Sequence, residues 1–403
     1  MSTNRASVKG LDLPALEACL ASVGETAPFR ARQVFQWIHG RGATSFAEMT
    51  DLPKPTRARL DAALTIGGVE IAEVATSVDG TRKIAIRLED GAEVESVIIP
   101  ERDRFTLCVS TQVGCALGCR FCFTGVMGWG RQMAAHEIVD QLYQANRVLA
   151  DRILANRAVA PDRAGADHVS NHEPSDSESA TGGHRGRVPR ITHVVFMGMG
   201  EPLANFDATL TALRLMTNPI GAGLSTRRIT VSTVGLVPEL LRLGHAIPVN
   251  LAVSLHAPND EIRGALMPIN KTYPIDALLN ACRNFPLPLR RRITFEYVLL
   301  AGINDAPSHA RELARRLHGV KSKVNLIVFN PFPGAPYDRP TDQAVETFRE
   351  TLVGRGITAT VRQSRGRDVF AACGQLANVR ATRSGEPIVS LEVPKKPKLS
   401  TAS

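Results

Sequence analysis

Apolar segments of strand length alternate with helical segments along most of the chain from residue 105 onward. The strand candidates are 105–110, 191–197, 228–233, 249–254, 293–300 and 324–329, with helical segments such as 135–149 and 274–284 between them. A repeated strand–helix–strand order implies parallel pairing, with helices packed on the sheet. Six such units are too few for an eight-stranded barrel. The sequence therefore predicts an α/β fold built on an open, partial (β/α)6 barrel.

The residues before this core predict an accessory region of a different kind. Residues 28–39 carry apolar side chains at helical spacing, with several arginines beside them. Residues 68–100 alternate as strands do, and Asp-Gly dipeptides at 79–80 and 90–91 are typical of hairpin turns. We therefore expect a helical unit followed by a three-stranded β-meander.

The overall charge narrows the class of partner. Lys and Arg exceed Asp and Glu by 48 − 39 = 9 residues. This balance favours an anionic partner such as nucleic acid, although it also serves solubility. The chain has no apolar run of about 18 residues and no apolar leader, so we expect a cytoplasmic protein without a membrane contact. An odd number of cysteines, seven, favours metal binding or catalysis over structural disulfides.

Two segments lack the apolar residues that a packed structure needs. Residues 161–190 are rich in Asp, Ser, Gly and His and contain no aromatic residue. The C-terminal end is basic and ends in small polar residues. The organisation that we expect is an accessory RNA-binding domain at 1–100, a core at 101–380 with a disordered insertion at 151–190, and a basic flexible tail at 381–403.

Three cysteines follow the first core strand with the spacing C-x3-C-x2-C: Cys115, Cys119 and Cys122. Three thiolates in one loop can hold three irons of a 4Fe–4S cluster, whereas most such clusters have four Cys ligands. The fourth iron is then open to a substrate or cofactor. Zinc is the alternative, but it usually takes four ligands, often as two C-x2-C pairs, and the chain has no second pair. The spacing thus favours an iron–sulfur cluster.

Polar residues follow the later core strands where each strand ends. The second strand leads into Gly198-Met-Gly-Glu-Pro202, in which Gly200 lets the backbone approach a ligand and Glu201 can accept a bond from an ammonium group. Further strands end at Ser232, at Ser254-Leu255-His256 and at Asn330. Each alone is more often a turn or cap residue. At equivalent ends of parallel strands, they indicate one ligand site.

The cysteine run and the glycine turn together resemble the radical S-adenosylmethionine (SAM) enzymes. The resemblance implies that the amino acid part of SAM chelates the open iron, and that its reductive cleavage gives a 5′-deoxyadenosyl radical. The electron would come from a donor such as flavodoxin or ferredoxin. By the same resemblance, SAM contacts Gly200, Glu201, Ser232, Ser254, Leu255, His256 and Asn330.

Two further cysteines narrow the resemblance. Cys108 lies shortly before the cysteine run, and Cys373 lies near the end of the core among three arginines that would favour a thiolate. Cys is often simply a buried residue, which is how we interpret Cys19 and Cys282. The complete set resembles the RlmN family of radical SAM RNA methyltransferases, over most of the chain except 151–190 and the tail.

This resemblance implies roles for three residues. Cys373 would carry the methyl group: one SAM methylates its sulfur, and a second yields the radical that activates this methyl group. The carbon would then add to C2 of an adenine, which is not nucleophilic enough for direct methyl transfer. Cys108 would free the product by forming a transient disulfide with Cys373, and Glu95 would remove the C2 proton. Without the resemblance, Glu95 reads as a solubilising charge on an edge strand, although its apolar neighbours suggest burial and a raised pKa.

The implied substrates are an adenosine of the large-subunit rRNA peptidyl-transferase centre and the adenosine next to some tRNA anticodons, modified by a monomeric enzyme. A Cfr-like enzyme, which methylates C8 of the same rRNA adenosine, is the nearest alternative. The more complete N-terminal helical unit favours C2. Two alternatives of other classes are a non-enzymatic RNA-binding protein with a structural metal and a radical SAM activase of a partner protein.

Overall fold

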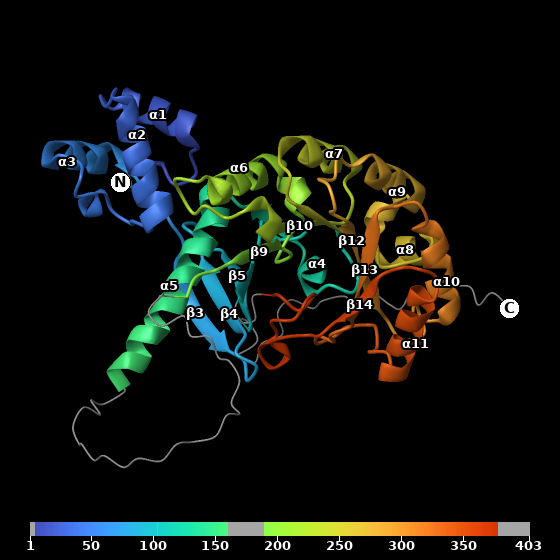
Figure 1. The fold of residues 1–403 in the computed structure, drawn as a ribbon. Helices are drawn as coiled ribbons and strands as arrows, with labels where there is room; N and C mark the ends of the chain where they lie inside the picture. The colour runs from blue at the N-terminus through green and yellow to red at the C-terminus, as the bar shows by residue number, and fades with distance from the viewer. Residues whose placement is uncertain (1–4, 103, 160–188, 378–403) are drawn as a thin grey trace, which may run out of the picture.

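The computed structural model describes residues 5–102, 104–159 and 189–377. Its main feature is one curved sheet of ten strands: β3 (Glu70–Thr76), β4 (Arg82–Arg87), β5 (Glu93–Glu101), β6 (Arg104–Cys108), β9 (His193–Phe196), β10 (Ile229–Thr233), β11 (Asn250–Ser254), β12 (Ile293–Leu299), β13 (Ser322–Val328) and β14 (Ala359–Arg362). Their order across the sheet is β14-β13-β12-β11-β10-β9-β6-β5-β4-β3. The sheet bends into an open barrel, so the α/β class and the partial barrel are confirmed (Figure 1).

All six predicted core strands are present, and each pairs in parallel with the next. A seventh parallel strand, β14, extends the sheet beyond the prediction. The sequence signal missed it because it is only four residues long and ends in an arginine.

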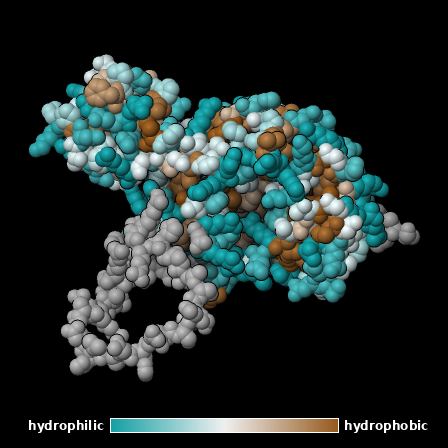
Figure 2. All heavy atoms as spheres, viewed as in Figure 1, coloured by the Kyte–Doolittle hydropathy of each residue, from teal (hydrophilic) through white to brown (hydrophobic). Residues whose placement is uncertain are grey.

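Helices cover the convex face of this sheet (Figure 1). They are α6 (Phe206–Thr217), α7 (Val237–Ala246), α9 (Ile275–Asn284), α10 (Pro307–Arg316) and α11 (Asp342–Val353). In α9 the buried residues recur at helical spacing and include Cys282, which therefore packs in the core. On the face seen in Figure 2 the surface is largely hydrophilic, with apolar residues in small groups. None of the described helices is long and apolar enough to cross a membrane.

The N-terminal region has the predicted helical unit and meander. The unit comprises α1 (Leu13–Ser22), α2 (Pro28–Phe35), a π-helical turn η1 (Gln36–Gly40) and α3 (Lys54–Ala63), closed by the short strands β1 (Ala6–Ser7) and β2 (Leu64–Thr65). Strands β3, β4 and β5 form an antiparallel meander, and the glycines of both Asp-Gly turns have the positive φ that such turns require. Because β5 also pairs with β6, the meander and the core share one sheet.

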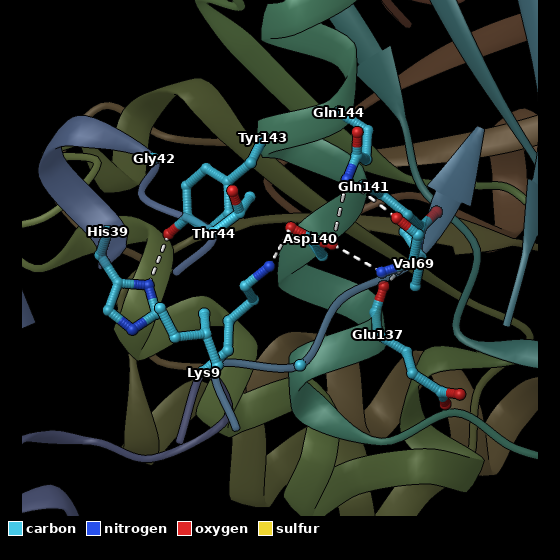
Figure 3. A network of polar contacts seen from close by, with 12 residues as sticks. Lys9, His39, Gly42, Thr44, Val69, Glu137, Asp140, Gln141, Tyr143 and Gln144 are labelled. Carbon is cyan, nitrogen blue, oxygen red and sulfur yellow. Dashed lines mark hydrogen bonds and ion pairs between the residues drawn. The ribbon is translucent and has the colours of Figure 1, made fainter. Parts of the chain in front are cut away.

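Helix α5 (Ala135–Val159) fastens the helical unit to this sheet. Its Asp140 is fully buried and accepts bonds from the Lys9 ammonium and the Val69 N–H, each at 2.7 Å (Figure 3). One turn further, the Tyr143 hydroxyl lies 2.6 Å from His39 Nδ1. Burial lowers the pKa of His39 to about 3, so the ring is neutral in this contact. A buried ion pair with satisfied partners fixes how the unit sits on the core.

Part of the predicted organisation lies outside the described residues. Helix α5 continues to Val159, so the first residues of the expected 151–190 insertion are helical. The rest of that insertion up to 188, and the tail at 381–403, lie outside the described part of the chain.

Candidate active site

A cavity of about 600 Å³ lies inside the open barrel. One wall comes from β5 and β6, and the opposite wall comes from β13, β14 and the loop that follows β14. Both Cys108 and Cys373 line it, together with Met197, Asn330 and Arg362. The structure therefore brings the two predicted sulfur residues, which are far apart in the sequence, to one cavity.

Cys108 is held by regular structure. It is the last residue of β6, where it pairs with Val97 of β5 on one side and with Val195 of β9 on the other. Burial raises the pKa of its thiol to about 12, and the charge of Cys373 adds to this while Arg362 opposes it. All seven cysteines are free thiols in this structure.

Cys373 lies in an irregular stretch, residues 366–377, which we call the Cys373 segment. It begins with a tight turn in which Gly366 and Phe370 both have a left-handed backbone, and the Ala371 N–H donates to the Gly366 carbonyl at 2.8 Å. The Asp368 carboxylate accepts bonds from the Ser77 hydroxyl at 2.5 Å and the Val78 N–H at 3.1 Å. The β3–β4 turn thus anchors one end of the segment.

The other end of the Cys373 segment is attached to the loop of the cysteine run. The Phe123 N–H donates to the Gly374 carbonyl at 2.8 Å, and the Thr124 hydroxyl donates to the Leu376 carbonyl at 2.6 Å. Because Thr124 is buried, this bond is shielded from water. The expected methyl carrier and the expected cluster ligands therefore lie in neighbouring loops.

The cysteine run connects β7 (Gln112–Gly114) to α4 (Phe123–Met127). Burial and the charges of the other two cysteines raise the pKa of the Cys119 thiol well above its usual value. Burial also raises the pKa of Cys115 to about 11 and that of Cys122. Backbone N–H groups of Leu117 and Gly125 oppose this by hydrogen bonding to the sulfurs of Cys115 and Cys122.

These residues suit an iron–sulfur cluster better than a single ion. Among the described residues, no three or more His, Cys, Asp or Glu side chains converge on a point where one metal ion could sit. A 4Fe–4S cluster binds each cysteine to a different iron, so its ligands do not need to converge. Hydrogen bonds to the sulfurs, as seen here, tune such clusters. The three cysteines therefore fit the cluster expected from their spacing.

The glycine turn after β9 needs its glycine for space as well as for conformation. Gly200 has φ +93°, and a Cβ there would lie 2.4 Å from the Gln112 Cβ. Glu201 follows with a buried carboxylate that accepts the N–H groups of Leu203 at 3.1 Å and Val234 at 2.9 Å. Burial raises the pKa of Glu201 to about 7 against these bonds. An ammonium group bound here would favour the charged form of this carboxylate.

The other strand-end residues also lie at the carboxyl ends of their strands. Ser232 is in the last part of β10, Ser254 ends β11, and Asn330 follows β13. The buried Oδ1 of Asn330 has no hydrogen-bond partner among the described residues, and Asn330 lines the cavity. An acceptor without a donor is costly in the protein interior, which suits a ligand that supplies the donor.

Leu255 and His256 continue this edge and connect it to the cysteine run. Both are buried, and His256 has a left-handed backbone with φ +57°. Its Nδ1 accepts the Val298 N–H at 3.0 Å, and burial lowers the pKa of the ring to about 3. The Phe121 ring packs edge-on against it at 4.7 Å.

Arg263 is a residue of this site that the sequence did not single out. It belongs to α8 (Asp260–Leu266) and is fully buried. Its guanidinium donates to the carbonyls of Val234 at 2.7 Å and Leu255 at 3.2 Å. It thus fixes the loops that leave β10 and β11. In the sequence, Arg263 is a charged residue between the apolar positions of a helix. Such residues are common on solvated helix faces, so this pattern did not indicate a buried site residue.

Arg362 is one of the arginines near Cys373 that the sequence indicated, whereas Gln141 was not singled out. Arg362 ends β14 with its Nη1 3.7 Å from the Met197 sulfur, and the charge of Cys373 raises the pKa of this arginine. Gln141 of α5 is fully buried and exchanges two bonds of 2.8 Å with the backbone of Ser110. It also accepts the Ser96 hydroxyl at 2.6 Å. Gln141 therefore holds β5 to the chain that leaves β6.

Glu95 is buried in β5 and is the neighbour of Ser96 in this arrangement. Its carbonyl accepts the Ser110 hydroxyl at 2.6 Å, so its backbone is fixed. Its side chain is not exposed at the edge of the sheet, because β4 and β6 flank β5. Burial raises the pKa of the carboxyl group. Glu95 is therefore not a solubilising charge on an edge strand.

The partial barrel, the three-cysteine loop and the glycine turn define the class of radical SAM enzymes. A family model described as the radical SAM superfamily matches residues 184–316. The crystal structure of a radical SAM methyltransferase from Sphaerobacter thermophilus is similar to this chain, with a TM-score of 0.78 and 42% identity, covering 92% of this chain and 99% of that one.

Further comparisons identify the family within this class. A model described as the ribosomal RNA large subunit methyltransferase N-terminal domain matches residues 7–66. The dual-specificity RNA methyltransferase RlmN of Syntrophobacter fumaroxidans is 47% identical over 369 residues, covering 92% of this chain and 97% of the relative. The RlmN of Anaeromyxobacter dehalogenans is 48% identical over 371 residues, covering 92% and 91%.

The chain belongs to the RlmN family of radical SAM RNA methyltransferases, as its resemblance predicted. Enzymes of this family use a 4Fe–4S cluster and SAM. This membership excludes the non-enzymatic RNA-binding protein and the activase that the sequence had left open.

Proposed function

We propose that this enzyme methylates C2 of an adenosine in large-subunit rRNA at the peptidyl-transferase centre, and C2 of the adenosine next to the anticodon of some tRNAs. Support for two substrates comes from relatives named as dual-specificity RNA methyltransferases. The observation that carries the chemistry is that Cys108 and Cys373 line one cavity.

In this proposal Cys373 carries the one-carbon unit. C2 of adenine is not nucleophilic, so a direct transfer of a methyl cation to it would fail. When bound, the cluster held by Cys115, Cys119 and Cys122 and two SAM molecules per turnover supply a methyl group and a 5′-deoxyadenosyl radical. The Cys373 sulfur takes the methyl group, and the activated carbon then bonds to C2. Arg362 supports this role, because its charge lies close to the Cys373 sulfur.

Cys108 and Glu95 complete the proposed reaction. Glu95 takes the proton from C2 of the adduct, and its burial suits a general base. Cys108 then loses its proton and attacks the Cys373 sulfur, so that a disulfide forms. The carbon leaves with the electron pair of the broken carbon–sulfur bond and takes up a proton, which completes the methyl group on C2. The rigid strand position of Cys108 supports this assignment.

We assign the SAM site to the carboxyl edge of the sheet. Burial disfavours the charge of the Glu201 carboxylate, and the SAM ammonium group would supply the cation that stabilises this charge. The unpartnered Oδ1 of Asn330 suits a donor of the cofactor. The remaining members of the proposed site are Gly200, Ser232, Ser254, Leu255 and His256.

The helical unit is the proposed RNA contact. The Phe29 ring is 58% exposed and Arg30 lies 5.0 Å from its centre. Arg41 lies 4.1 Å from the Trp37 ring. Aromatic rings beside arginines can stack unpaired bases and contact phosphates, as an adenosine that leaves its helix requires. We further propose a monomer in the cytoplasm that receives electrons from flavodoxin or ferredoxin.

The test is the identity of the methylated base. The protein is reconstituted anaerobically with iron and sulfide and incubated with SAM, a reductant and either an rRNA fragment or tRNA. We expect 2-methyladenosine by mass spectrometry of the nucleosides from both substrates. Formation of 8-methyladenosine alone would overturn the proposal in favour of a Cfr-like activity. The Cys19→Ala variant is the matched cysteine control and retains the product.

A further inference from the structure

A buried ion pair in the meander contacts the proposed base. The Lys83 ammonium lies 3.0 Å from Glu95 Oε1, with side chains 11% and 5% exposed. Lys83 pairs in register with Val97, and Ala85 pairs with Glu95. Lys83 and Glu95 are therefore diagonal neighbours on one face of the sheet, where long side chains of adjacent strands meet.

The second carboxylate oxygen contacts the Cys373 segment. Glu95 Oε2 accepts the Ala377 N–H at 2.8 Å, and the preceding residue, Leu376, lines the cavity. Each oxygen thus has one donor from the protein and keeps a lone pair for a proton. The two donors come from distant parts of the chain. Lys83 belongs to β4, which precedes Glu95, and Ala377 follows Cys373 near the end of the described residues. Together they fix both the position and the orientation of this group.

Lys83 has a large influence on the pKa of the Glu95 carboxyl group. Burial raises the pKa of the carboxyl group, and Lys83 is the largest influence that lowers it. The Ala377 N–H also lowers this pKa, and Glu93 of the same strand raises it. Without Lys83, only one neutral donor would oppose burial and Glu93, so a larger fraction of the carboxyl group would be protonated.

We propose that Lys83 is a positioning residue for Glu95, which keeps the carboxylate charged and oriented for removal of the C2 proton. This inference rests on the proposed function. In the step concerned, the unpaired electron left by radical addition would return to the bound cluster, the proton of the C2–H bond passes to Glu95, and the electron pair of that bond restores the aromatic purine ring. Lys83 keeps its own proton throughout and does not contact the substrate.

The test measures two steps separately: the methylation of Cys373, which does not use Glu95, and the decay of the protein–RNA adduct, which does. In the reconstituted enzyme, transfer of a methyl group from SAM to Cys373 is followed by intact mass. Decay of the covalent protein–RNA adduct is followed on denaturing gels in single turnover, over a range of pH. We expect Lys83→Met to keep the methylation of Cys373. At pH values below the Glu95 pKa, it should slow adduct decay about tenfold for each unit by which that pKa rises.

The pH dependence gives the sign of the effect. A general base works in its ionised form, so adduct decay accelerates as pH rises through the Glu95 pKa. Loss of Lys83 raises this pKa further, so the acid limb of the profile moves to higher pH in Lys83→Met. In Lys83→Arg the charge is retained, and the limb returns towards that of the wild type. Arg87→Met removes an exposed cation paired with Glu93 on the same two strands, and it should move the limb much less than Lys83→Met does, because Glu93 has the smallest of the influences on Glu95.

Three results would overturn the inference. One is a decay rate that falls by the same factor at every pH in Lys83→Met. Another is a failure of Lys83→Arg to restore the limb. The third is loss of Cys373 methylation in both Lys83→Met and Lys83→Gln, since this would show a role in folding alone. A wild-type enzyme that forms neither adduct nor methylated adenosine would instead refute the proposed function.

Discussion

The two walls of the cavity carry one reactive sulfur each and are built in different ways. Cys108 ends a strand with hydrogen-bonded neighbours on both sides, so the sheet itself fixes its place. Cys373 belongs to an irregular segment whose position depends on a few bonds to distant parts of the chain. In the proposed reaction the two walls have different tasks: the strand wall presents a fixed thiol, Cys108, and the loop wall presents the sulfur of Cys373, which would react with successive partners. The difference also predicts that single substitutions lower the rate of adenosine methylation more in the loop wall than in the strand wall.

Removal of the Cys373 sulfur has the largest expected effect. Cys373→Ala should lower formation of methylated adenosine at least about 10³-fold, because a lost covalent carrier has no substitute in the cavity. The measurement is the yield of methylated nucleoside by mass spectrometry, with SAM cleavage followed in parallel. Product at the wild-type rate would mean that Cys373 carries no carbon.

Removal of the opposite sulfur should stop the reaction later. Cys108→Ala leaves the methylation of Cys373 intact and lets the RNA bond to it, but the adduct cannot be released by a disulfide. We expect product to fall on the order of 10²-fold and a covalent protein–RNA species to accumulate on denaturing gels. If this variant and Cys373→Ala behaved alike, with no adduct in either, the two walls would not have the separate roles assigned here.

A smaller effect should distinguish the two walls without touching either sulfur. Thr124→Val removes the buried hydroxyl that donates to Leu376 and leaves that carbonyl unpaired, at a cost of about 1–3 kcal/mol. We expect turnover to fall about fivefold to tenfold, measured as the initial rate of adenosine methylation. The matched change in the strand wall, Thr106→Val in β6, should alter the rate less than about twofold, because a β-branched residue suits a strand. Equal losses in both variants would contradict the comparison.

The sequence predicted the regular elements of the molecule better than its irregular parts. The six core strands and the meander are local patterns of apolar residues, and the structure contains them all. The cysteine run and the strand-end residues were found because their signals lie within a few positions of one another. Lys83, Gln141 and Arg263 were not found, because a charged or amide side chain shows its importance only through partners elsewhere in the chain.

Glu95 illustrates the limit best. One of its two side-chain partners lies 282 residues away, and no local pattern can indicate such a contact. Its role was named only through a family resemblance, and it remains a proposal. The structure adds its burial and its partners, which turn an apparent surface charge into a candidate base.

The shared sheet has a consequence for modular engineering of this enzyme. A core cut out at residue 101 would begin with β6 as an unprotected edge, prone to association with other chains, and would lack the strand that carries Glu95. The helical unit is a better unit of exchange, because its family model ends at residue 66, before the meander begins. A chimaera joined there would need to preserve Lys9, whose buried ion pair with Asp140 aligns the unit on the core. In the proposed function, where the helical unit contacts RNA, such a chimaera would exchange the RNA contact and leave the reaction centre unchanged.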